Sequence, residues 1–136
     1  MTGSIPTFGQ VERTLSQRIL ALYRAQTGHR LERVTSQIVD HKIVIVLENS
    51  VTQPEQLLLG NGKEALAEEI HDTLNEAIQP QIRSLIEEVV GVSVIDLLSD
   101  AKLDTERTGF IALLAEAPRL GDRSGGNKTN ESRKVS

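Results

Sequence analysis

The hydrophobic positions near the start of the chain recur every three or four residues. This spacing predicts an amphipathic helix over residues 9–26, because side chains three and four apart share one face. Its apolar positions are Val11, Leu15, Ile19 and Leu22. Gly28 follows the last periodic residues and is suited to the left-handed turn that commonly ends a helix.

An alternating pattern replaces the helical one after this glycine. Two strands are predicted over 34–39 and 42–47, with only Asp40 and His41 between them, so we expect a tight hairpin. The second strand reads Ile-Val-Ile-Val-Leu from residue 43, which is typical of a strand covered on both faces. The first strand alternates less cleanly, and we expect it nearer the edge of the sheet.

Two helices are predicted next. Thr52 and Glu55 can cap the first turn of a short helix over 53–59, with the Glu55 carboxylate reaching back to the Thr52 amide. A long helix then runs from the Asn61–Glu64 segment to Gly91. Pro80 interrupts it, and we expect a kink near 77–79 rather than an end, because the apolar stripe keeps its phase across the proline. The stripe consists of Leu66, Ile70, Leu74, Ile78, Ile82, Leu85, Ile86 and Val89.

Alternation returns over 92–97 and 109–114 and predicts two more strands, joined by a polar loop over 99–107. The fold class is therefore α+β, in the order α-β-β-α-α-β-β. We expect a four-stranded, mainly antiparallel sheet of two hairpins packed on the long, Pro-kinked helix, with strand order left open. Residues 9–116 form one domain, and residues 117–136, rich in Gly, Ser, Asn, Lys and Arg, are predicted to be a disordered basic tail.

Composition narrows the function classes. The 136 residues contain no cysteine, which excludes disulfides, thiolate metal sites and cysteine nucleophiles. The net charge is −4, and because the tail is basic the body is more acidic still, so nucleic acid is an improbable partner. The start of the chain lacks the pattern of a signal peptide, and no apolar run reaches the about 20 residues of a transmembrane helix. We expect a soluble cytoplasmic protein.

Candidate chemistry is sparse. His29, His41 and His71 have no spacing that places two of them on one side of an element as metal ligands. The first two are expected at the surface, and His71 cannot face its neighbour Asp72 along a helix. An enzyme would need a cleft that gathers residues such as His71, Arg83 and Asp96. We therefore predict no catalytic residues, no metal and no cofactor.

The long helix is the candidate interaction surface. A helix of this length exceeds what four short strands can cover, so we expect leftover apolar surface that favours a second copy of the chain. The candidate homodimer or partner interface consists of Leu66, Ile70, Leu74 and Ile78. A different possibility is a ligand pocket between the sheet and the helix near Pro80 and Arg83, where a kink frees backbone carbonyls.

Three segments resemble the MpsC-like family, named for a component of a bacterial sodium-translocating, membrane-potential-generating system. They are residues 39–47 (VDHKIVIVL), 51–58 (VTQPEQLL) and 86–92 (IEEVVGV). The similarity extends from about residue 11 to 114, while the loop at 29–32 departs from the Gly- and Pro-containing turn of the family. The resemblance implies a small cytosolic accessory protein, encoded near membrane proteins of ion or inorganic-carbon uptake. It carries over no catalytic residues.

The leading hypothesis is therefore a non-enzymatic, dimeric accessory or regulatory protein that binds an unidentified protein partner at the cytoplasmic membrane face. The alternative is a sensor of a small ligand, bound between the sheet and the kinked helix.

Overall fold

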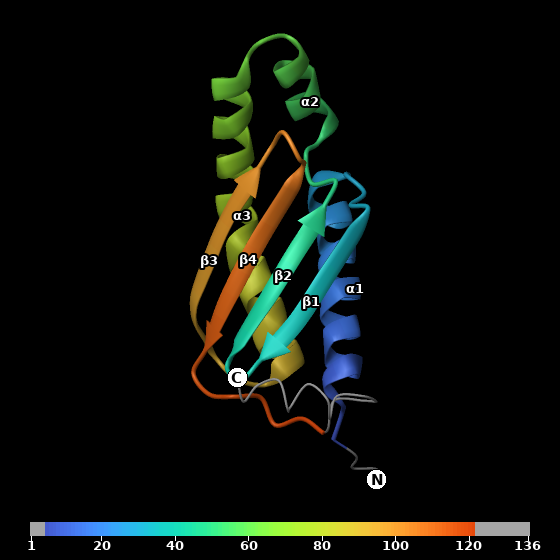
Figure 1. Cartoon of the computed structure of the whole chain (residues 1–136), viewed down its shortest axis with the longest axis vertical. Helices are drawn as coiled ribbons and strands as arrows, with labels where there is room; N and C mark the ends of the chain where they lie inside the picture. Colours follow the sequence, from blue (N-terminus) through green and yellow to red (C-terminus); the bar gives the residue numbers. More distant parts are fainter. Residues whose placement is uncertain (1–4, 122–136) are drawn as a thin grey trace, which may run out of the picture.

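The computed structural model of the chain describes residues 5–121. Four strands form one sheet, and helices α1 and α3 pack on a single face of it, so the molecule has two layers (Figure 1). In chain order the elements are α1 (Phe8–Thr27), β1 (Arg33–Val39), β2 (Lys42–Glu48), α2 (Gln53–Gly60), α3 (Glu64–Val90), β3 (Val94–Lys102) and β4 (Arg107–Leu114). The predicted α+β class and its order α-β-β-α-α-β-β are confirmed.

Local sequence signals explain both ends of α1. Thr7 caps the first turn: its hydroxyl accepts from the Gln10 amide at 3.1 Å, and the Gln10 side chain accepts from the Thr7 amide at 2.9 Å. These reciprocal bonds satisfy amides that have no partner within the helix. Gly28 ends the helix at φ 74°, a left-handed conformation in which a glycine has no Cβ to clash.

The sheet is antiparallel throughout, in the order β1-β2-β4-β3. The predicted edge position of β1 is confirmed, and β3 forms the other edge. The predicted loop over 99–107 is wrong in its extent: β3 continues to Lys102 and β4 begins at Arg107. Polar residues continue along these strands because one face of the sheet is exposed, so polarity there does not mark a loop.

The core lies between the helices and the covered face of the sheet. It consists mainly of aliphatic side chains from α1, α3 and all four strands, with Leu31 of the α1–β1 loop and the aromatic side chains of Tyr23 and Phe110. On β2, Ile43, Ile45 and Leu47 are fully buried, whereas Val44 is 40% exposed. The expectation that β2 is covered on both faces is therefore wrong for the described chain, because both long helices pack on the same side.

The long helix continues through Pro80, as expected from the unbroken phase of its apolar stripe. Its C-terminal half packs under the sheet. Its N-terminal half projects beyond the end of the strands together with α2 (Figure 1). This confirms that the helix is longer than the sheet can cover. We call α2, the turn 61–63 and the projecting half of α3 the hairpin.

The two ends of the described chain meet at the pole opposite the hairpin. Gly121 pairs with Thr7 in a parallel bridge, and its amide donates to the Pro6 carbonyl at 2.9 Å. Pro118 is buried and Leu120 packs against the core, so packed chain extends past residue 117. The rest of the predicted tail, residues 122–136, lies outside the described residues.

Candidate functional site

A buried ionisable pair joins α2 to α3. Glu55, in the first turn of α2, is fully buried, and His71 on α3 is 7% exposed. The His71 Nδ1 atom lies 2.6 Å from Glu55 Oε2. The other carboxylate oxygen accepts from the Thr52 amide and the Thr52 hydroxyl, both at 2.8 Å. The predicted capping role of Glu55 toward the Thr52 amide is thus confirmed, and the same carboxylate also binds the histidine.

Two hydroxyl groups connect this pair to the sheet. His71 Nε2 lies 3.1 Å from Thr108 Oγ1 at the start of β4. Thr108 Oγ1 lies 2.8 Å from Ser50 Oγ, which also donates to the Glu106 carbonyl at 3.2 Å. Thr108 and Ser50 are 1% and 4% exposed. A continuous buried network therefore fixes the base of the hairpin on the sheet, since buried polar groups are costly unless they are hydrogen-bonded.

The network shifts the acidity of two groups. Burial raises the pKa of Glu55, but hydrogen bonds from His71 and from the Thr52 amide and hydroxyl, with the charge of His71, outweigh it and hold that pKa below its ordinary value. Burial, together with the nearby Glu55 carboxylate, raises the pKa of Tyr23 far above its ordinary value. The arrangement thus favours an ionised Glu55 beside a neutral Tyr23.

A small cavity borders this network. Its volume is about 20 Å³, which matches roughly one water molecule. Asn75 lines it and donates to Ser99 Oγ at 2.7 Å, while its buried Oδ1 has no hydrogen-bond partner among the described residues. The cavity walls come from α1 and the residue His29 just after it, the segment before α2, the first turn of α2, and α3: Tyr23, Thr27, His29, Ser50, Thr52, Glu55, His71, Leu74, Asn75 and Ile78. The space is too small for a metabolite.

The residues predicted as an interface separate into two groups. Leu66 and Leu74 are 44% and 40% exposed, and Ile70 is partly exposed. Ile78 is only 4% exposed and belongs to the core, so it offers no surface to another chain. We call the line Leu66, Ile70 and Leu74 the hairpin stripe. Spaced four residues apart on α3, these three side chains lie on one side of the projecting helix.

The two residues of the predicted pocket lie elsewhere. Pro80 is exposed. Arg83 is about half exposed, and its guanidinium donates to the Val94 carbonyl, which ties α3 to the start of β3. Neither residue lines the cavity beside His71. The structure therefore brings His71 together with Glu55 rather than with Arg83.

A wide acidic groove lies between α3 and the β3–β4 turn, with a volume of about 630 Å³. It is lined by Leu59, Glu64, Glu68, Asp72, Asp100, Ala101, Lys102, Leu103 and Asp104. Its α3 carboxylates are offset by two residues from the hairpin stripe, about 200° around the helix. Within residues 5–121 no group of three or more His, Asp or Glu side chains could hold a metal ion. The groove thus has a strongly acidic wall opposite the apolar stripe.

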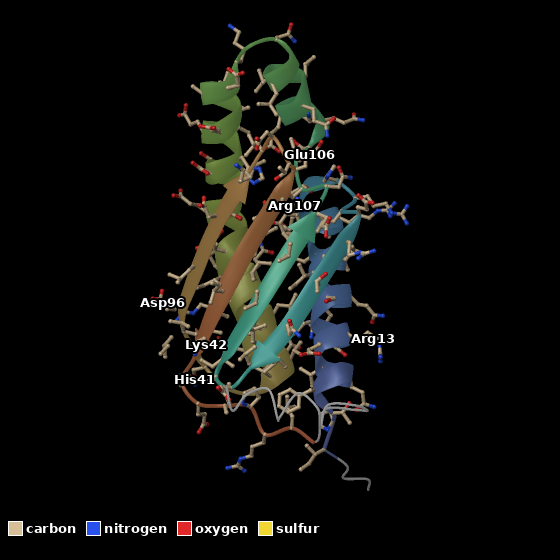
Figure 2. All side chains as sticks on the ribbon, in the orientation of Figure 1. Arg13, His41, Lys42, Asp96, Glu106 and Arg107 are labelled. Carbon is tan, nitrogen blue, oxygen red and sulfur yellow. The ribbon has the colours of Figure 1, made fainter. Side chains whose placement is uncertain are left out.

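The remaining two histidines differ in exposure. His41 is exposed at the β1–β2 turn (Figure 2), as predicted. His29 is partly buried, and its Nε2 atom lies 2.6 Å from the Asn49 carbonyl.

Sequence reasoning missed the Glu55–His71 pair, although one signal was present. His71 precedes Ile78 by seven residues and Leu85 by fourteen, which places it on the buried line of the helix.

Comparison with known proteins gives one match. The family model described as Na+-translocating membrane potential-generating system (MpsC) matches residues 7–116. No curated protein and no solved structure matches the chain. Among the described residues, no helix has both the length and the apolar character needed to cross a membrane.

Proposed function

Because the chain belongs to the MpsC family, we propose that it is a non-enzymatic accessory or regulatory protein of the system named in that family description. It acts by binding another protein. The docking surface is the hairpin stripe, Leu66, Ile70 and Leu74.

The observation that carries this proposal is the exposed apolar stripe on a projecting element. Apolar side chains that recur at four-residue spacing on a helix are the usual anchors when a helix docks into a groove of a partner. Leu66 and Leu74 remain 44% and 40% exposed, whereas the later members of the same α3 stripe, Ile78, Ile82, Leu85 and Ile86, are buried in the core. Leu57 on the neighbouring helix α2 is 66% exposed and is a further exposed apolar side chain of the hairpin.

The buried network supports a structural role for the only closely paired His and Glu of the described chain. Both ring nitrogens of His71 already have partners, and the Glu55 carboxylate is fully buried. A general base must reach the proton that it abstracts, and this pair has access only to a cavity of about 20 Å³. We therefore assign the network to holding the hairpin on the sheet rather than to catalysis.

The partner is a membrane protein of the same system, with its docking groove at the cytoplasmic face. No helix of the described residues is suited to cross a membrane, so ion movement would belong to another component, because a spanning segment must satisfy its own backbone within the lipid. The acidic groove on the opposite side of α3 would repel anionic lipid headgroups and keep the apolar stripe as the contact surface.

A photo-crosslinking experiment in the native cell tests this assignment. A photoreactive amino acid at position 66 or 74 should form a discrete adduct with one membrane protein. The same photoreactive amino acid placed at position 68, on the acidic side of α3, is the matched control and should give no such adduct. Charge introduced by Leu66→Glu with Leu74→Glu should abolish membrane association while leaving the circular dichroism spectrum unchanged. Equal adducts from positions 66 and 68, or full membrane association of the double variant, would contradict the proposal.

A further inference from the structure

The sheet has one face that neither helix covers, turned toward the viewer in Figure 1. We call it the open face. The strand register arranges its side chains in four rows across β1, β2, β4 and β3. The rows are Arg33, Glu48, Arg107 and Lys102; Thr35, Val46, Gly109 and Asp100; Gln37, Val44, Ile111 and Leu98; and Val39, Lys42, Leu113 and Asp96.

The centre of the open face is apolar. Val44, Leu98 and Ile111 are 40%, 49% and 40% exposed, and they lie side by side in one row. Gly109, in the next row, leaves a hollow. The groove there has a volume of about 340 Å³ and is lined mainly by apolar atoms of β2, β4 and β3. An apolar patch with a polar rim is typical of an interaction surface.

The charged rim of this face is unequal at its two ends. Arg33, Arg107 and Lys102 lie at the end nearer the hairpin, with Glu48 among them, and Glu48 pairs with Arg107 at 3.7 Å. Lys42 and Asp96 lie at the opposite end, as Figure 2 shows for Lys42, Asp96 and Arg107. The row at the hairpin end therefore has a net positive charge, whereas the row at the opposite end contains the acidic Asp96 together with Lys42.

We infer that the open face packs against the open face of a second copy of this chain, with the two-fold axis running across the strands. This axis passes over the row Ser36, Ile45, Phe110 and Ser99, whose side chains point to the covered face. Each strand then lies over the same strand of the partner in the opposite direction. Two sheets that pack face to face in this way bury both inner faces.

The charges select this orientation. On β3, Lys102 of each copy lies over Asp96 of the other, and on β2, Glu48 lies over Lys42. An axis along the strands would instead place Glu48 over Arg107 but also Arg33 over Lys102, so in that row a contact between like charges offsets each contact between opposite charges. Opposed like charges are unfavourable in an interface.

The shape of the face agrees with the same orientation. Ile111 of each copy lies over the hollow at Gly109 of the other, and Val44 lies over Val46. The dimer would thereby cover the second, apolar face of β2, whose sequence is that of a strand buried on both sides. The inference uses a surface separate from the hairpin stripe and goes beyond the proposed function.

Light scattering after size exclusion, across a micromolar concentration series, tests the dimer. The wild type should have about twice the 14.9 kDa mass of one chain, and Ile111→Asp should have the mass of one chain. Asp96→Lys and Lys102→Glu alone should each weaken the dimer about fivefold to tenfold, because two symmetry-related ion pairs become repulsive. The combined Asp96→Lys/Lys102→Glu variant should recover wild-type affinity.

Ile95→Asp is the matched control: Ile95 is 61% exposed but lies at the β3 irregularity, outside the four rows, and its substitution should leave the mass unchanged. A monomeric wild type at these concentrations would overturn the dimer, and a dimer without recovery in the combined variant would overturn the orientation. Crosslinking at positions 66 and 74 is a separate measurement. Failure of the dimer would therefore not count against docking through the hairpin stripe, and failure of the crosslinking would not count against the dimer.

Discussion

Removal of the Glu55 carboxylate should strongly destabilise the fold, and Glu55→Ala is the most direct test of the buried network. The substitution removes the acceptor of three hydrogen bonds, two from Thr52 and one from His71. Thr52 is partly exposed, so its amide and hydroxyl can bond to water instead. His71 is 7% exposed and would keep a buried, unpaired Nδ1.

The expected loss of folding stability comes mainly from the buried His71 nitrogen that is left without its carboxylate partner. Breaking a buried pair by removal of one partner typically costs about 3–5 kcal/mol, a large part of the about 5–15 kcal/mol that stabilises a domain. With a urea slope of about 2 kcal/mol/M, a loss of about 4 kcal/mol moves the unfolding midpoint down by about 2 M. Urea titration followed by circular dichroism measures this shift.

Glu88→Ala is the control for this measurement. Glu88 pairs with Arg18 at 3.0 Å, but its side chain is 67% exposed, so the loss should stay within about 0.5 kcal/mol. The double variant Glu55→Leu/His71→Phe should cost less than Glu55→Ala, because it leaves no unpaired ionisable group. A loss below about 1 kcal/mol for Glu55→Ala would refute the reasoning that the pair is energetically important.

Two further predictions concern pH and Pro80. The folded-state pKa of Glu55 lies below its ordinary value of 4.5, so its stabilising contribution is complete above that value and is lost as the pH falls through the folded pKa. Wild type should therefore lose more stability on acidification below pH 4.5 than Glu55→Ala does, as urea midpoints at several pH values would show, and equal losses would contradict this. Pro80→Ala should raise the free energy of unfolding by about 1–3 kcal/mol, because it restores an amide donor in the interior of α3. A lower melting temperature for this variant would instead indicate that packing requires the local geometry at Pro80.

Local patterns predicted the elements, whereas contacts between elements decided the site. Thr52 and Glu55 are three residues apart, so a capping rule finds them. Glu55 and His71 are 16 residues apart, and they meet only because the turn at 61–63 folds α2 back onto α3. Asn61 illustrates the same point: expected to help open α3, it instead donates to the Leu57 carbonyl at the end of α2.

The open face could not be predicted for a related reason. A β-branched run such as Ile43–Leu47 indicates that both of its faces suit an apolar environment, but it does not say which element covers each one. Within the described chain both long helices pack on the same side. The strand ends at Lys102 and Arg107 were missed because exposed polar side chains on a strand resemble those of a loop.

The pairing of Thr7 with Gly121 has a practical consequence for any labelled form of this protein. A fluorescent reporter or affinity tag fused at either end would leave the body at the same pole, remote from Leu66 and Leu74. Two labels attached near Pro6 and Leu120 would lie close together and report whether the protein is folded. Labels at these two described positions would lie at the pole opposite the hairpin and leave Leu66 and Leu74 uncovered for binding measurements.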